Sequence, residues 1–271
     1  VLDINTGRSK DDQIAKNLFL VNGSMTMTGG RIGGYVAVTD SKAKDGKKPY
    51  LCLSGTAQIT GAKQGHNNLQ LNTANDGSTL DVKNLSKGGK IGVTASGKFT
   101  NQTGAGNMSY FASDIGGTIS YVDGCLFEGR LGCLCGAGKG ESHIGKCDGA
   151  LLPWQSWASD KTLPTAEGYY CLLRDVQCGQ NSVQAGAHVH LDLNGKTVTG
   201  KEGSRIYTTF HEDSHLTITD SGKTGRLVAT GAGNAQGMGL WIRYGSATLY
   251  GGTLDASAAT STMSGVAVRV D

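Results

Sequence analysis

GSATLYGGTLDAS, at residues 245–257, has the same pattern as GSMTMTGGRI, at residues 23–32. The shared pattern is Gly-Ser-x-Thr-apolar-x-Gly-Gly-x-apolar, and its two copies lie near opposite ends of the chain. Each copy alternates in polarity with a period of two and is bounded by glycines, which is typical of a short β-strand between turns. The sequence therefore predicts the same local structure at two distant places.

Other segments of the chain follow the same rule. Thr, Val, Ile and Leu fill their alternating positions, as β-propensity favours, and Gly, Asn or Asp bounds them. These segments are GTAQITG (55–61), GSTLDV (77–82), VHLDLNGKTVTG (189–200) and SHLTIT (214–219). Because long helical periodicity is nearly absent, the sequence predicts an all-β protein.

Three architectures can be built from many short strands: a sandwich or barrel, an antiparallel meander, and a parallel β-helix. The strands of a sandwich occupy unlike places, so a sandwich has little reason to repeat one side-chain pattern. In a solenoid each coil meets the same neighbours, so the same apolar positions and turn residues recur. The spacing of Gly23, Gly55 and Gly77 fits coils of roughly 20–30 residues. The repeat therefore favours a parallel β-helix.

Composition narrows the possible partners. The chain has 271 residues, of which 43 are Gly and 3 are Pro, and its net charge is +3. A charge this small gives no reason to expect a nucleic acid partner. No apolar run approaches the roughly 20 residues of a membrane-spanning helix, so no membrane insertion is expected. The first and last residues read as the interior of a polypeptide, so we expect the rest of a longer parent chain on either side.

The repeats also resemble a known family. SGTAQITGAKQGHNNLQL (54–71), GGKIGVTASGKFTN (88–101), LDLNGKTVTG (191–200) and HLTITDSGKTGRL (215–227) are similar to modules of large secreted or surface proteins of gut Firmicutes. Those modules are right-handed parallel β-helices of the pectate-lyase-like superfamily. The resemblance implies a right-handed solenoid, an extracellular or cell-surface location, and adhesion or glycan binding.

The repeat pattern stops near residue 123 and resumes at YYCLLRDVQC (169–178). Between them lie a cysteine cluster and Trp154 and Trp157, which we expect to close the apolar end of a coil. In the resembling family, a Trp-containing segment followed by LPT and GYY looks like the start of a new β-helix. We therefore expect a first β-helical segment at 1–123, a Cys-rich cap or linker at 124–168, and a second β-helical segment at 169–271.

The cap contains a candidate metal site. Cys133, Cys135, His143 and Cys147 supply three thiols and one imidazole, the donor set of a structural zinc ion. Such a site would contribute much of the folding energy of a short segment with little apolar core. Disulfides are an equal alternative, pairing Cys147 with Cys125 or with Cys133, and free thiols are a third. Cys171 and Cys178 could also bridge two strand ends.

Candidate ligand-binding residues lie in the second β-helical segment. In HVHLD, His188, His190 and Asp192 alternate with Val189 and Leu191, so the polar row is expected to face solvent. An exposed row of this kind could bind a metal or a sugar, although an ordinary outer face is the simpler interpretation. Tyr250 alternates with Leu249 and is likewise expected to point outward, where its ring could stack on a sugar.

Three functions follow from these patterns. The favoured one is a non-catalytic module of a secreted or cell-surface bacterial protein, a rigid stalk or adhesion surface for glycans or host proteins. The alternative is a polysaccharide-active enzyme, a lyase or glycoside hydrolase, which would need paired carboxylates. A structural fibre or self-assembly component is the third. No catalytic residue set is assigned from the sequence.

Overall fold

The structure is a computed structural model that describes residues 2–4, 13–14, 18–20, 23–39, 49–61, 68–72, 80–86, 91–95, 97–137, 140–145, 147–231, 237–258 and 265–271. These residues form strands and one 3₁₀ helix, η2 (Ala105–Tyr110), and most strand pairs are parallel. The expected all-β class is therefore confirmed. Within the described ranges, no helix has the length and apolar character needed to cross a membrane.

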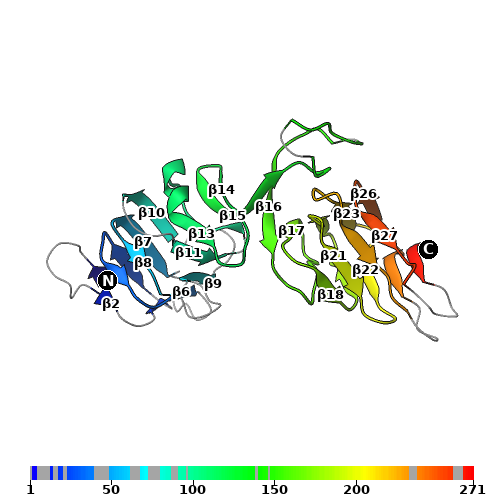
Figure 1. Cartoon of the computed structure of the whole chain (residues 1–271), viewed down its shortest axis with the longest axis horizontal. Coiled ribbons are helices and arrows are strands. Elements are labelled where there is room, and N and C mark those ends of the chain that lie inside the picture. Colours follow the sequence, from blue (N-terminus) through cyan, green and yellow to red (C-terminus); the bar gives the residue numbers. More distant parts are fainter. Residues whose placement is uncertain are drawn as a thin grey trace. The chain divides into compact units, whose positions relative to one another are not determined.

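The chain divides into two compact units, residues 1–130 and 131–271. The expected cap at 124–168 thus has its first residues in one unit and the remainder in the other. Figure 1 shows the strands of each unit, coloured along the sequence. Each unit is described by itself below.

In the first unit, three parallel sheets have the orders β1-β4-β7-β10, β2-β5-β8 and β3-β6-β9-β11-β13. The chain visits them in turn from β1 to β9, and the apolar side chains between them form one core. The strands are β1 (Leu2–Ile4), β2 (Gln13–Ile14), β3 (Leu18–Leu20), β4 (Ser24–Met27), β5 (Arg31–Ile32), β6 (Val36–Thr39), β7 (Tyr50–Gly55), β8 (Gln58–Ile59), β9 (Leu69–Asn72), β10 (Leu80–Leu85), β11 (Ile91–Thr94) and β13 (Phe111–Ser113).

The first unit ends in antiparallel structure. The strand β15 (Cys125–Gly132) pairs antiparallel with β12 (Gly97–Lys98) and with β14 (Ile119–Val122). Asp123 and Gly124 connect β14 to β15, and both have positive φ angles, 47° and 80°. This is the Asp-Gly signature of a two-residue hairpin turn. The last parallel strand of this unit is therefore β13, and β14 pairs antiparallel before residue 123 is reached.

The second unit repeats the three-sheet arrangement. Its sheets have the orders β16-β17-β20-β23-β26, β18-β21-β24-β27 and β19-β22-β25-β28. The strands are β16 (Leu152–Trp157), β17 (Gly168–Leu172), β18 (Val176–Cys178), β19 (Asn181–Val183), β20 (His188–Asp192), β21 (Thr197–Gly200), β22 (Arg205–Thr209), β23 (His215–Thr219), β24 (Arg226–Val228), β25 (Met238–Ile242), β26 (Ser246–Leu249), β27 (Thr253–Asp255) and β28 (Val266–Val270). From β17 onward the chain enters the first, second and third sheet in strict rotation.

Within each parallel sheet, side chains of the same kind pair between neighbouring strands. Val189 pairs with Leu216, and Leu191 pairs with Ile218 in the next coil. All four are buried and belong to one apolar core. Burying each such side chain stabilises the fold by about 1.5–3 kcal/mol. Because the alternation has a period of two, a slip of one residue would expose the whole row, so the pattern also sets the register.

The two copies of the opening motif fold alike. Each forms a strand, a glycine turn and a second strand, namely β4 and β5 in the first unit and β26 and β27 in the second. The first glycine of the motif has a φ of 95° at Gly23 and 74° at Gly245. The last glycine has a φ of 76° at Gly30 and 91° at Gly252. Residues other than glycine rarely adopt a positive φ angle, which explains why both copies of the motif keep glycine at these positions.

Candidate metal centre

A tight turn after β15 carries the first two candidate ligands. The Gly136 N–H donates to the Cys133 carbonyl over 3.0 Å, and Gly136 has a φ of 79°. Inside this turn, the Sγ atoms of Cys133 and Cys135 lie 3.1 Å apart, and both residues are buried. The turn thus brings both thiols of the Cys-x-Cys pair to the same side.

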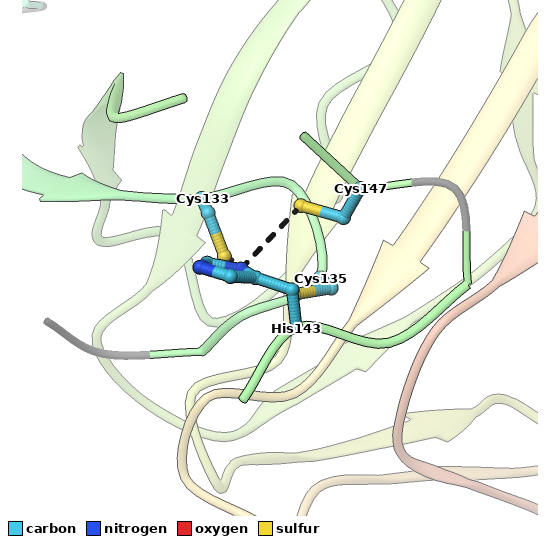
Figure 2. Close-up of side chains that lie close together, drawn as sticks. All are labelled: Cys133, Cys135, His143 and Cys147. Atoms are coloured by element: carbon cyan, nitrogen blue, oxygen red, sulfur yellow. Dashed lines mark hydrogen bonds between the residues drawn. The ribbon is translucent and has the colours of Figure 1, made fainter. Parts of the chain in front are cut away.

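His143 and Cys147 return to this turn and complete the cluster. The Nδ1 atom of His143 lies 3.6 Å from the Cys135 Sγ and 3.9 Å from the Cys147 Sγ. The three sulfurs and the imidazole converge in Figure 2, and one atom from each residue lies within 4.8 Å of the others. Ligand atoms at 2.0–2.3 Å around one tetrahedral zinc ion would lie roughly 3.3–3.8 Å apart. These four residues could therefore hold a metal ion.

The pKa values of the two turn thiols are shifted in opposite directions. Burial, together with the hydrogen bond to Cys135, raises the pKa of Cys133 to about 11. Burial also acts to raise the pKa of Cys135, but backbone hydrogen bonds from Ile144 and Ala137 outweigh it and lower that pKa. Hydrogen bonds donated to a sulfur favour its charged thiolate, the form that binds metals, whereas a thiol that donates its own proton is held in the neutral form. The environment of Cys135 is thus already arranged for an anion.

The segment that carries the ligands, described at residues 133–137, 140–145 and 147–149, is called the Cys/His loop below. It packs on the outward side of the sheet that contains β20, β23 and β26. A Cβ atom at Gly136 would lie 2.6 Å from the Thr219 hydroxyl, and one at Gly145 would lie 2.8 Å from the Tyr250 ring. The loop and the sheet are therefore in direct contact.

The apolar contacts that hold the described part of this loop involve a small cluster of side chains. Cys133, Cys135 and Ala137 form its buried cluster, and Cys147 and Tyr250 pack against them. Lys223 adds an ion pair with Glu141 at 3.3 Å, but both side chains are largely exposed. An exposed pair of this kind contributes little to stability. Metal ligation would therefore add a strong interaction to a loop that has a small apolar cluster.

Trp154 differs from its expected place. Trp157 packs edge-on against Tyr170 beside the core, as a residue closing the end of a coil would. Trp154 instead contacts Tyr169 on the outward side of the sheet, at 5.6 Å between ring centroids. It is fully buried, and its Nε1 donates to the Gly132 carbonyl over 3.0 Å. It therefore anchors the start of the Cys/His loop.

The expected solvent-facing row of His188, His190 and Asp192 is corrected in part. His188 is exposed and His190 is half-buried, but Asp192 is fully buried. The Asp192 carboxylate accepts hydrogen bonds from the Asn194 N–H and from both the N–H and the hydroxyl of Ser221, at 2.8–2.9 Å. The alternation was predicted correctly. The exposure was wrong because the loop contacts Thr219, the neighbour of Asp192 in the next coil.

His190 lies against an aromatic ring. Its imidazole stacks on Tyr169 with ring centroids 4.4 Å apart and an interplanar angle of 9°. Its Nδ1 atom is buried and has no hydrogen-bond partner among the described residues. Burial, together with the charges of the nearby His215 and His188, lowers the pKa of His190 to about 4. His190 is therefore a neutral packing residue at pH 7, and any ligand-binding role for it stays a prediction.

Tyr250 is also less exposed than expected, because the Cys/His loop packs against its ring. Beside it lies an open pocket of about 670 Å³. Cys135, Glu141 and Ile144 line its loop side, and Lys223 and Tyr250 line its sheet side. The structure thus joins a predicted binding residue, Tyr250, to the predicted metal residues, which the sequence analysis had treated as separate sites.

The supporting residues Thr219 and Tyr169 were missed from the sequence. A signal for Thr219 was present, because the repeats HVHLDLNG and HLTITDSG align Asp192 with Thr219. Stacking the repeats would have placed both in one outward row. No sequence pattern showed that the Cys/His loop would cover that row.

The disulfide alternatives find no support in the geometry. All seven cysteines lie among the described residues, and none is in a disulfide. Cys171 and Cys178 are both buried, and Cys178 packs in the core of the second unit.

Comparison with known proteins finds no matching family model, no matching curated protein and no matching solved structure.

Proposed function

We propose that each unit is a right-handed parallel β-helix and that the chain is a non-catalytic module of a secreted or cell-surface protein. The observation that carries this proposal is the strict rotation of β17 to β28 through three parallel sheets. Such a stack is rigid and presents a long side-chain surface, which suits a stalk or an adhesion surface for glycans or host proteins. The repeat style shared with gut Firmicutes surface proteins supports the same location.

We further propose that the Cys/His loop binds a structural zinc ion through Cys133, Cys135, His143 and Cys147. Three thiolates and an imidazole suit zinc, and four protein ligands leave no position for a reacting water. The ion would link the turn at Cys133 to the returning segment at His143 and so keep the loop on the sheet. Its contribution would be to folding rather than to chemistry.

The state of Asp192 supports a non-catalytic assignment for the polar row of β20. Its carboxylate is buried and accepts hydrogen bonds from Asn194, Ser221 and the Cys171 thiol, so it is held as a structural acceptor. A general acid or base must instead reach a substrate atom directly or through one water. Neither condition for acid–base catalysis is met by this group.

The test combines metal content with glycan binding on one sample. Native mass spectrometry of the intact chain should give one zinc per molecule, and a glycan array or host-protein panel should give saturable binding without turnover. Cys135→Ser should lose the zinc, and Cys178→Ser, a buried cysteine outside the cluster, should keep it. A full complement of zinc in the Cys135→Ser variant would refute the assigned ligand set.

A polysaccharide-active enzyme is the second candidate, and one observation favours it. Asp160 and Asp175 line the same open groove, of about 470 Å³, along the outer side of β18 and β21. Lys161 and Lys201 line it as well. Paired carboxylates in a groove are what glycoside hydrolysis needs.

Reducing-end assays on pectin, mucin and host glycans separate the two candidates. The scaffold proposal expects no new reducing ends with the unmodified chain. Depolymerisation that Asp160→Asn or Asp175→Asn abolishes would replace it by the enzyme proposal. Depolymerisation that survives both substitutions would overturn the scaffold proposal and place the active site elsewhere.

A further inference from the structure

A second surface of the 131–271 unit carries a concentration of arginine and aromatic side chains. It lies on the sheet in which β25 runs between β22 and β28. Leu240 of β25 is buried in the core, so its neighbour Trp241 points outward. We call the outward group around Trp241 the arginine–aromatic patch. It consists of Arg205, Trp241, Arg243, Tyr244 and Arg269.

The guanidinium groups of the patch are held by ring contacts. Arg205 of β22 lies 4.2 Å from the Trp241 ring centroid, and Arg269 of β28 lies 5.4 Å from it. The indole is thus approached from the strands on both sides. Arg243 lies 5.7 Å from the ring of Tyr244, which is 48 % exposed. Stacked arginines can present N–H edges to carboxylates and lose less freedom on binding. In this patch the Arg205 Nη1 donates to the Gln180 side chain over 3.3 Å, and its remaining N–H groups can serve a ligand.

One carboxylate of the chain already sits on this patch. Asp271 accepts a hydrogen bond from the Trp241 Nε1 at 2.7 Å and another from the Arg269 Nε at 2.8 Å. The patch therefore has the donor geometry for a carboxylate. The patch holds three guanidinium groups, and among the described residues only that of Arg269 forms an ion pair, with Asp271.

We propose that the arginine–aromatic patch is a docking surface for a protein segment rich in aspartate and glutamate. Arginine, tryptophan and tyrosine are the residue types that dominate the energy of protein–protein interfaces. Carboxylates are the partners that planar guanidinium groups bind with two parallel hydrogen bonds. The proposal deepens the proposed surface-binding function by naming a partner class, and it rests on that function.

The same geometry argues against a nucleic acid. Single strands bind proteins largely by stacking bases on open aromatic faces. Here guanidinium groups from two strands already lie over the Trp241 ring. The net charge of the chain, +3, is also small for a phosphate-binding protein.

The experiment measures binding of a fluorescein-labelled octaglutamate peptide to the intact chain by anisotropy at low and moderate salt. Two triple variants remove equal charge. One changes Arg205, Arg243 and Arg269 to Gln, and the other changes the exposed Lys161, Lys201 and Lys223 to Gln. The arginine variant should weaken binding about ten-fold or more, because it removes preorganised bidentate contacts, while the lysine variant should weaken it about two-fold. Thermal unfolding of both variants checks that each is folded.

Three results would overturn the proposal. They are equal weakening by the two triple variants, no saturable binding of octaglutamate at low salt, and tighter binding of a labelled oligothymidylate of equal charge. None of these results bears on zinc content or on glycan cleavage, so failure of the patch and failure of the proposed function remain distinguishable.

Discussion

The strands of residues 169–271 bury a continuous set of aliphatic side chains, whereas the apolar cluster in the described part of the Cys/His loop consists of Cys133, Cys135 and Ala137. The coils therefore fold by the hydrophobic effect and by ladder hydrogen bonds. The described part of the loop has a small apolar core and is not part of a sheet. Its distinguishing feature is the set of four donor atoms that converge on one point. Two segments in one compact unit thus depend on different interactions, and each should respond to a different perturbation.

The largest expected effect comes from the coils. Leu191→Ala removes a fully buried side chain between two neighbouring coils and leaves a cavity. We expect a loss of about 2–5 kcal/mol in the free energy of unfolding. Chemical denaturation followed by circular dichroism measures it. Exposed Leu151, in the segment before β16, supplies the control, since Leu151→Ala should cost well under about 1 kcal/mol.

A smaller effect is expected where the loop meets the coils. Asp192→Ala leaves the Asn194 N–H and the two Ser221 donors without their acceptor. We expect a loss of about 1–3 kcal/mol in the free energy of unfolding, because these part-buried donors lose their acceptor. Asp192→Asn keeps one acceptor oxygen and should lose less. If Asp192→Ala instead abolished ligand binding at unchanged stability, the structural assignment of this carboxylate would be wrong.

Acid should weaken the same face of the coils. The pKa of His190 is lowered to about 4 by burial, so between pH 6.5 and pH 4 the unfolded chain binds a proton that the folded chain does not. Stability is therefore complete above about pH 6.5 and falls as the pH drops toward 4. We expect a loss of about 1–2 kcal/mol, because His190 is partly exposed and solvent screens its charge.

Urea denaturation across this range measures the effect. His190→Asn should flatten the pH dependence, although the lowered pKa of His215 leaves a residual slope. An unchanged slope in His190→Asn would show that other groups carry the acid sensitivity.

The smallest effect on global stability is expected from the metal ligands. All four lie within one short segment, so the loop can keep its ion when the coils unfold, and the two processes are only weakly linked. Cys135→Ser, or chelation, should change the unfolding free energy of the coils by less than about 1 kcal/mol. It should nevertheless raise hydrogen exchange at Gly136 and Ile144, since the loop would leave the sheet. Loss of the whole unit on chelation would show that the loop and the coils form a single cooperative structure.

The short strands and their parallel stacking were predictable from the sequence because the pattern that encodes them is local and repeated. Val189 and Leu191 alternate with polar residues, and the glycines at Gly23 and Gly245 recur with their motif. The four clustered ligands were predictable for the same reason, since their spacing lies within one segment. Burial of Asp192 was not predictable, because it depends on a loop from a distant part of the chain covering an ordinary polar face. The stacking of His190 on Tyr169 likewise depends on which coil lies beside which.

The rotation of β17 to β28 through three sheets also makes the length of the unit adjustable. Among the described residues, each round of three strands pairs with the round before and the round after, and equivalent positions in β20, β23 and β26 pair in register. A genetic duplication or deletion of one whole winding would rejoin matching neighbours. The reach of such a protein can therefore change in steps of a single winding, about 4.8 Å, without inventing a new core.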